Sequence, residues 1–136
     1  MAAFDEQLFV GTWHIVASNF PMWVAGGRTQ PRFHYEQLEP GRLSDRVTYV
    51  RRGRERQILG IDTRLPGDVP TYRWRGAGAL RLLRSDWQVS QWDPGYEWAV
   101  ITFAKSLVTP AGMDLIARSP GNELEKQSRE LGLKML

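Results

Sequence analysis

The sequence predicts an all-β protein: an antiparallel up-and-down β-barrel of about eight to ten strands, with a short N-terminal helical turn and one C-terminal α-helix. Residues 9–119 divide into about eight or nine short runs, several of them alternating, separated by Gly- and Pro-containing turns roughly every eight to twelve residues. These runs follow one another as a meander, which favours a barrel over a sandwich. After Pro120 and Gly121, the stretch from Asn122 to Leu131 has no glycine or proline before Gly132 and predicts a single helix.

Length and composition fit one folded domain spanning residues 1–136. A chain of 136 residues can form one hydrophobic core but not two. Hydrophobic residues at 42% and charged residues at 24% are values of a globular protein and exclude a disordered one. The six tryptophans are many for this length, so large flat side chains must be buried or must line a site.

The first predicted strand, Phe9 to Asn19, organises the rest of the chain. Residues 3–8 form a helical turn before it, which caps one end of the barrel. Gly11 allows the chain to enter the strand at close quarters, and the indole of Trp13 then plugs one end of the closed sheet. From Trp13 onward, alternate residues point to opposite faces, as in a strand.

An apolar loop, residues 20–31, follows this strand. Loops are normally solvated, but this one contains Phe20, Met22 and Trp23. Two interpretations remain open: a lid over the mouth of a cavity, or a loop packed on the outside of the sheet.

The remaining strands are separated by turn residues such as Pro40–Gly41, the tetrad 52–55, residues 66–70 and Pro94–Gly95. We expect strands at about residues 32–38, 43–51, 56–64, 71–78, 79–86, 87–93, 96–104 and 113–119. The helix is expected at about residues 121–132, where Asn122 and Glu125 form a capping box. Its apolar edge, which includes Leu124 and Leu131, is expected to lie against the outside of the barrel.

The charge pattern argues against a nucleic-acid partner. The 18 basic residues, all but three of them arginine, exceed the acidic ones by 3, but no basic block extends beyond Arg51–Arg56. The alternation in Tyr72–Arg75 is better explained by one strand with aromatic side chains inward and arginines outward. The arginines are therefore interpreted as a solvated outer face.

The chain has no cysteine, so no disulfide and no thiolate chemistry is available. The N-terminal residues are acidic where a secretory signal would be basic, and no segment approaches the length of a membrane-spanning helix. As the sequence stands we expect a cytoplasmic protein without a membrane span. If a signal peptide precedes the given chain, a secreted or periplasmic location follows.

Two histidines, His14 and His34, are the only imidazoles. They cannot form a three- or four-ligand site by themselves, so we expect no metal. His14 should face outward if Trp13 faces inward. The following strand can adopt either phase: Phe33 and Tyr35 inward, or His34 and Glu36 inward as an acid/base pair and the candidate catalytic residues.

Three features resemble one protein family. They are Gly11-Thr12-Trp13 after a short turn, an acidic and aromatic hairpin at Asp93–Tyr96, and the segment Asp114–Pro120 followed by a helix. Together these features resemble bacterial lipocalins, within the calycin group of small barrels that bind hydrophobic ligands. A count of nine or ten strands would instead be similar to the fatty-acid-binding or nitrobindin-like members.

The resemblance implies that the first-strand tryptophan stacks on the last-strand arginine and closes the floor of the barrel. The matching positions are Trp13 and Arg118, and such a desolvated cation–π contact contributes about 2 kcal/mol or more. Their implied role is structural and not catalytic.

The alternation of inward and outward side chains along each strand predicts which residues line the cavity above this floor. Such a lining is mostly apolar with a few hydroxyl and indole donors, as in small-molecule sites. The expected ligand-binding residues are Ile15, Ala17, Asn19, Phe20, Met22, Trp23, Phe33, Tyr35, Trp87, Tyr96, Trp98, Val100 and Ile116. The alternative is that a barrel this small fills itself with side chains.

Two functions remain open on the sequence. The first is binding, for transport or sequestration, of a hydrophobic or aromatic small molecule in the barrel. The second is an intracellular enzyme without a cofactor, a cyclase, isomerase or dehydratase that uses the same cavity, for instance in secondary metabolism. Because six tryptophans exceed what one small cavity holds, we also expect Trp74 or Trp92 at a homodimer interface or beneath the helix.

Overall fold

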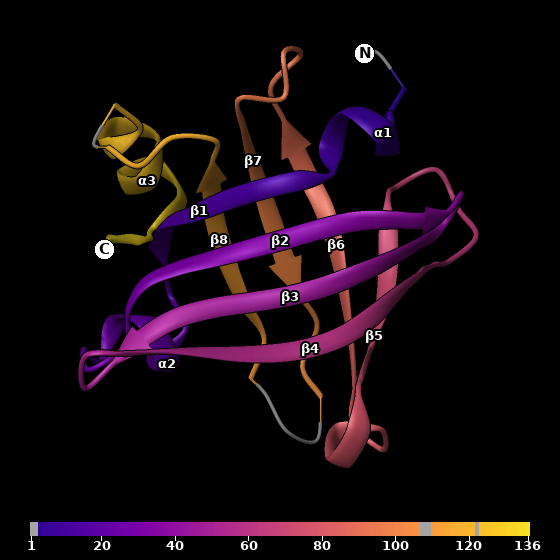
Figure 1. Cartoon of the computed structure of the whole chain (residues 1–136). Helices are drawn as coiled ribbons and strands as arrows, with labels where there is room; N and C mark the ends of the chain where they lie inside the picture. The colour runs from indigo at the N-terminus through magenta and orange to yellow at the C-terminus, as the bar shows by residue number, and fades with distance from the viewer. Residues whose placement is uncertain (1–2, 107–109, 122) are drawn as a thin grey trace.

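The computed structural model describes residues 3–106, 110–121 and 123–136 and contains a closed barrel of eight antiparallel strands (Figure 1). The barrel strands are β1 Gly11–Ser18, β2 Thr29–Glu39, β3 Arg42–Arg51, β4 Arg54–Arg64, β5 Thr71–Gly76, β6 Arg84–Trp92, β7 Trp98–Phe103 and β8 Gly112–Ala117. The described helices are α1 Glu6–Phe9, α2 Pro21–Val24, the 3-10 turn η1 Gly78–Leu80 and α3 Glu125–Leu131. The predicted all-β class and up-and-down order are confirmed.

The first strand closes the barrel. The first half of β1 pairs with β2, from Gly11 to His14, and its second half pairs with β8, from His14 to Ser18. A ninth strand, β9 (Lys134–Met135), pairs with the end of β1 on the outside. In Figure 1, β1 to β4 cross in front of β5 to β8 at a steep angle, so the two groups form opposite walls.

The turn between β3 and β4 is shorter than expected. Arg52 and Gly53 both have positive φ, 53° and 73°, as a two-residue hairpin of type I′ requires. Arg54 and Glu55, expected in the turn, therefore belong to β4.

The segment 79–86 is not a strand of its own, which corrects the predicted strand count. Gly76 ends β5, and a Cβ there would overlap Leu80, so the chain turns tightly into η1. The next strand starts only at Arg84 and continues to Trp92 as β6, which joins two predicted strands into one. The apolar run that suggested a strand instead places Leu80 and Leu83 at the rim of the barrel.

The two short helices beside β1 cover opposite ends of the barrel, because one precedes the strand and the other follows it (Figure 1). α1 is tied to its end by Glu6, which accepts hydrogen bonds from the Gln37 side chain (2.7 Å), the Gly41 backbone (2.8 Å) and the Tyr72 hydroxyl. Phe9, at the end of α1, is fully buried in the barrel interior. This end is closed by side chains and by backbone.

A second, smaller core lies between the outer face of the barrel and the C-terminal segment. Val16, Val100 and Leu115 form it with Leu133, and the predicted edge residues Leu124 and Leu131 pack against it. α3 ends at Gly132 in a left-handed conformation, φ 73°. The predicted capping residue Asn122 lies outside the described residues; Leu124 occupies the N-cap position and makes no side-chain capping bond.

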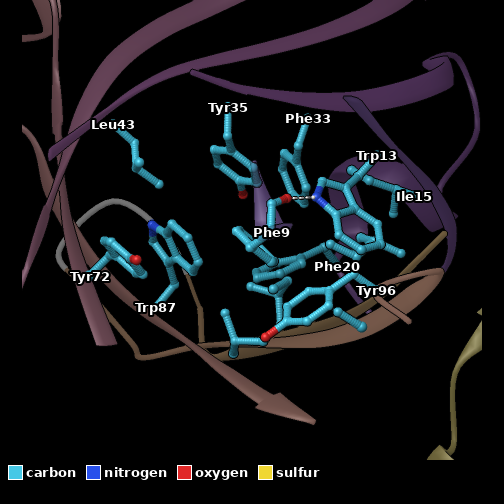
Figure 2. Close-up of a cluster of buried hydrophobic side chains, with 14 of the residues drawn as sticks. Phe9, Trp13, Ile15, Phe20, Phe33, Tyr35, Leu43, Tyr72, Trp87 and Tyr96 are labelled. Carbon is cyan, nitrogen blue, oxygen red and sulfur yellow. Dashed lines mark hydrogen bonds between the residues drawn. The ribbon is translucent and has the colours of Figure 1, made fainter. Parts of the chain in front are cut away.

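The closed end depends on Arg118. Its guanidinium lies 3.7 Å from the centroid of the Trp13 ring and donates hydrogen bonds to the backbone carbonyls of Leu8, Phe9, Thr12 and Tyr96, at 2.8–3.2 Å. The Trp13 indole in turn donates to the carbonyl of Phe9 at 2.8 Å (Figure 2). Gly11 has φ 115°, and a Cβ there would lie 3.0 Å from the guanidinium, which explains why glycine precedes Trp13. One cation thus joins α1, β1 and the β6–β7 turn.

Substituting Arg118 with lysine should lower the free energy of unfolding by about 2–4 kcal/mol. A lysine keeps the charge but cannot stack flat on Trp13 or reach four carbonyls with a planar fork. Urea unfolding at neutral pH measures the change. The control is Arg129→Lys, which affects an exposed pair with Glu125 and should shift stability by less than about 0.5 kcal/mol. Equal effects of the two substitutions would show that Arg118 does not hold the closed end.

Candidate ligand-binding site

A cavity of about 370 Å³ occupies the barrel at the end covered by α2. Its walls come from the inward faces of β2, β3, β4, β5, β6, β7 and β8. The lining residues are Phe20, Met22, Trp23, Phe33, Tyr35, Asp45, Val47, Ile58, Trp74, Leu80, Leu83, Ser85, Trp87, Phe103 and Asp114. This volume is at the lower end of the range for small-molecule pockets, so the space suits a small ligand.

The mouth of the cavity is framed by α2 and the η1 turn. Pro21 starts α2, where its missing N–H is not needed, and its fixed φ favours the first helical turn. Phe20 packs edge-on against Phe103, with ring centroids 5.1 Å apart, and Trp23 does the same with Tyr49 at 5.6 Å. α2 therefore lies across the open end of the barrel, the first of the two arrangements considered from the sequence. The loop is shorter than expected, because residues 29–31 already belong to β2.

Aromatic rings from opposite walls meet in the middle of the barrel (Figure 2). Tyr35 stacks on Trp87 (centroids 5.4 Å apart, 22° between planes), and Trp87 stacks on Tyr72 (4.7 Å, 20°). Phe9 reaches the same group from the closed end and stacks on Tyr35 at 5.3 Å. These stacked rings form the base of the cavity and fill the barrel between it and the closed end.

The wall beside β4 is made by the Trp74 indole, which lies close against the backbone at Gly60. A Cβ at Gly60 would overlap the Trp74 ring and the Arg75 carbonyl oxygen, so only glycine allows the indole to lie there. Trp74, which we expected at an interface or beneath the helix, lines the cavity instead. Trp92, the other candidate, packs against Phe4 at the closed end, with centroids 5.3 Å apart.

Three aspartates are buried inside this aromatic barrel. Asp45 and Asp114 line the cavity and are 5% and 1% exposed, and Asp62 is fully buried. The Trp87 indole N–H donates to Oδ1 of Asp62 at 3.0 Å. Among the described residues, Oδ1 of Asp45, Oδ2 of Asp62 and both carboxylate oxygens of Asp114 have no hydrogen-bond partner.

Strand register explains how these acids reach the interior. Asp45 is directly opposite Tyr35 on β2, and Asp62 is opposite Leu43 on β3, so the two carboxyl groups are diagonal neighbours on one face. Asp114 is opposite Ser18 at the end of β1 that leads to α2. Asp45 alternates with the buried residue Leu43, and Asp114 alternates with the buried residue Ile116.

Burial changes the protonation of these groups. It raises the pKa of Asp45 from its ordinary value of 3.8 to about 6 and that of Asp114 to about 7. Burial, followed by the charge of the neighbouring Asp45, raises the pKa of Asp62 well above its ordinary value. Asp45 and Asp114 therefore ionise within the physiological pH range, and the charge of Asp45 disfavours ionisation of Asp62.

The structure brings together about half of the residues expected to bind a ligand. Phe20, Met22, Trp23, Phe33, Tyr35 and Trp87 line the cavity, and Ile15, Tyr96 and Ile116 lie in the same interior core without lining it. Ala17, Trp98 and Val100, expected inside, lie in the outer core beneath the C-terminal segment. Asn19 is exposed, and its side-chain oxygen accepts a hydrogen bond from the Met113 backbone at 2.8 Å.

The displaced residues of β1 and β7 have separate causes. The pairing of β1 with β8 shifts register between Ile15 and Ala17, which moves Ala17 out of the interior. Tyr96 has φ 57° and lies in the turn before β7, so its direction does not set the phase of the strand. Ala99 and Ile101 are consequently the inward residues of β7.

The acid/base pair considered for β2 does not face the cavity. Phe33 and Tyr35 are buried, and Glu36 is exposed on the outer face. His34 lies between two hydroxyl groups on that face, with Nδ1 3.0 Å from Thr12 Oγ1 and Nε2 2.8 Å from Thr48 Oγ1. Burial and the nearby arginines lower its pKa. His34 and Glu36 are therefore removed from the candidate site, since alternation places them on the face opposite Tyr35.

Sequence reasoning missed Asp45, Asp62 and Asp114. A usable signal was present: Asp45 alternates with Leu43 and Val47, and Asp114 stands among apolar residues of the last strand. An acid in the inward phase of a barrel strand should be treated as a site candidate, because a buried carboxyl group is costly unless it has a partner.

A larger hollow of about 620 Å³ lies on the outer surface between β1, β2 and the C-terminal residues. The cations along it are already engaged or solvated: Arg32 pairs with Glu55 at 3.0 Å, Arg28 lies over Tyr49, and Lys134 is exposed. Nε of Arg28 and Nε of Arg32 are also buried without a partner among the described residues, but both side chains make other contacts. The barrel cavity is the better candidate because its unpaired atoms belong to carboxyl groups enclosed by aromatic rings.

The free energy of unfolding should fall as the pH rises from 5 to 8. Because the folded-state pKa of Asp114 is raised, the folded chain holds a proton that the unfolded chain has released, and this advantage is lost as the pH passes 7. Between pH 5 and pH 8, Asp114 alone should account for a loss of about 2.5 kcal/mol. Urea unfolding at several pH values should show a smaller fall for Asp114→Asn than for the unsubstituted chain.

The control for this experiment is Asp86→Asn. Arg73 lowers the pKa of Asp86, so the stabilisation by that pair is already complete above about pH 4. Asp86→Asn should therefore leave the pH dependence of the free energy of unfolding between pH 5 and 8 unchanged. If the free energy of unfolding of Asp114→Asn fell with pH as steeply as that of the unsubstituted chain, the raised pKa of Asp114 would be contradicted.

Neither a protein-family model nor a curated protein sequence matches this chain. Solved structures do match it. The siderocalin Ex-FABP, described as functioning through dual ligand specificities, is 18% identical, with 92% of this chain and 87% of that chain covered and a TM-score of 0.67. A biogenic amine-binding protein is 13% identical, with 99% and 82% covered and a TM-score of 0.67.

A third similar structure is apocrustacyanin C2, which is 12% identical, with 93% of this chain and 70% of that chain covered and a TM-score of 0.66. All three have the lipocalin architecture, and identities this low establish a common fold only. With its closed eight-stranded barrel and a C-terminal helix on the outer surface, this chain has the lipocalin fold.

Proposed function

We propose that this protein binds a small, largely apolar organic molecule in the barrel cavity. The observation that carries the proposal is the aromatic cavity of about 370 Å³, which remains unfilled although the other end of the same barrel is densely packed. An eight-stranded barrel has just enough room to be filled by its own side chains, so an open half is not required by the fold.

The lining supports apolar recognition. Phe33, Trp74 and Trp87 offer ring faces to a ligand, and burial of apolar surface contributes about 25 cal/mol per Å² removed from water. Similar structures that are named for ligand specificities and for amine binding agree with this role. Among the described residues no helix is long and apolar enough to cross a membrane.

Filling the cavity should abolish binding without unfolding the protein. Val47 lines the cavity and is only partly buried, so Val47→Phe should project its ring into the cavity and reduce affinity for a neutral aromatic probe at least about 10-fold. The neutral dye N-phenyl-1-naphthylamine, followed by its fluorescence, measures binding. Arg46→Phe is the control, because Arg46 is exposed on the outer face of the same strand.

The outcome is decided by comparing these two variants with the unsubstituted chain. A dye that binds all three chains equally would bind outside the barrel, and an unsubstituted chain that binds neither the dye nor 2-phenylethanol would overturn the proposed function.

A second candidate function uses the same cavity for proton transfer. It is favoured by one observation: Asp45 and Asp62 are buried diagonal neighbours beside the cavity, and burial raises the pKa of Asp45 to about 6, which suits a general base. These residues take the place of His34 and Glu36 in the enzyme alternative, with the ligand as substrate for isomerisation.

Deuterium incorporation separates a carrier from such an enzyme. Binding alone predicts that a ligand recovered after incubation in D2O with the protein has no deuterium on carbon. Deuterium that appears with the unsubstituted chain and disappears with Asp45→Asn would support catalysis. Mass spectrometry of the recovered ligand gives the answer, with Asp86→Asn as the surface control.

A further inference from the structure

The barrel cavity is acidic inside a basic protein. The chain carries 18 basic residues and a net charge of +3, yet the described lining of the cavity contains two aspartates and no lysine, arginine or histidine. The basic side chains therefore lie on other surfaces, and Asp45 and Asp114 have no counterion within the lining.

These carboxyl groups are also short of hydrogen-bond donors. Asp114 is 1% exposed and Asp45 is 5% exposed. Over the described residues, neither oxygen of Asp114 makes a hydrogen bond of ordinary geometry, nor does Oδ1 of Asp45, and the nearby Ser18 hydroxyl only partly offsets the rise in the pKa of Asp114. Buried carboxyl groups are normally paired, because a lone one must give up either its charge or part of the free energy of folding. Donors are thus expected from a bound molecule.

The acidic groups act on one part of the cavity. Asp45 lies directly opposite Tyr35, and after burial the charges of Asp45, Asp62 and Asp114 all raise the pKa of the Tyr35 phenol. Tyr35 and Trp87 are stacked there, and Phe33 lies beside them with its ring centroid 5.7 Å from that of Tyr35. The negative electrostatic potential of these carboxyl groups is therefore located in the part of the cavity that is also lined by aromatic rings.

This combination selects among cations. Aromatic faces attract ammonium groups, and a buried carboxylate adds a charge-assisted hydrogen bond. A metal ion would need more oxygen or nitrogen ligands, and no group of three or more acidic, histidine or cysteine residues among the described residues is arranged to hold one. An organic cation with an apolar body satisfies both the rings and the acids.

We propose that the ligand of this cavity is a small organic amine, bound as its ammonium ion, with the carboxylates of Asp45 and Asp114 as counterions and the rings of the lining around its apolar part. The inference rests on the proposed function, because it names the class of molecule that the cavity takes. Asp62 is the diagonal neighbour of Asp45 and accepts a hydrogen bond from the Trp87 indole at 3.0 Å.

A matched set of three probes tests the charge preference. 2-Phenylethylamine, 2-phenylethanol and phenylacetate have similar size and carry a positive, no and a negative charge at pH 7.5. We expect the amine to bind at least about 10-fold more tightly than the alcohol, and phenylacetate to bind most weakly. Competition with the neutral dye measures all three.

The Asp114→Asn variant assigns the preference to the acids. The substitution keeps the shape and removes the charge, so affinity for the amine should fall about 10-fold while affinity for the alcohol stays within about twofold. Asp45→Asn should act in the same direction, and Asp86→Asn, on the outer surface, should change neither affinity.

The possible results separate this inference from the function on which it rests. Equal binding of amine and alcohol, or a preference for phenylacetate, overturns the amine assignment and leaves a neutral-ligand barrel. Loss of alcohol and amine binding together in Asp114→Asn also overturns it, because the acid would then support the cavity and not the charge. Absence of binding by every probe and by the dye overturns both proposals.

Discussion

The contact between Arg118 and Trp13 is the interaction on which the arrangement of this barrel depends. It joins the last barrel strand to the first and holds α1 across one end through backbone carbonyls. Phe9 then fills the interior from that side and supports the stack of Tyr35, Trp87 and Tyr72. Because one end is filled in this way, the remaining space lies at the other end, beneath α2, where a ligand can enter.

The interior contains features that have opposite effects on the stability of the fold. Aromatic packing stabilises the barrel, whereas three buried aspartates with unpaired oxygens destabilise it once they ionise. Residues that cost stability without an evident structural benefit are typical of functional sites. A bound cation would remove this cost, so ligand binding and folding stability should be coupled in this protein.

The sequence predicted the class of the fold, most strand positions and the floor contact. Glycine and proline mark the turns clearly, and Trp13 and Arg118 stand at recognisable places in the first and last strands. Which residues of each strand face the interior was less predictable. The register shift after Ile15 and the positive φ of Tyr96 each reverse which residues face inward, and neither is visible as a break in the pattern.

The polar part of the site was missed for a different reason. Alternation with Leu43 and Val47 could have indicated that Asp45 faces inward, but only the pairing of β3 with β4 places Asp45 and Asp62 on diagonal positions of one face. The aromatic residues of the cavity, by contrast, were accessible from alternation, since Phe33 and Tyr35 have little reason to face water.

The most direct test of this account is a count of the protons released when 2-phenylethylamine binds. Titration calorimetry at pH 6.5 in two buffers with different ionisation enthalpies gives this number. Asp114 is mostly protonated at that pH and Asp45 partly so; a bound ammonium ion lowers both pKa values, and release of close to one proton is predicted. Binding with no proton release, or with proton uptake, would contradict the account.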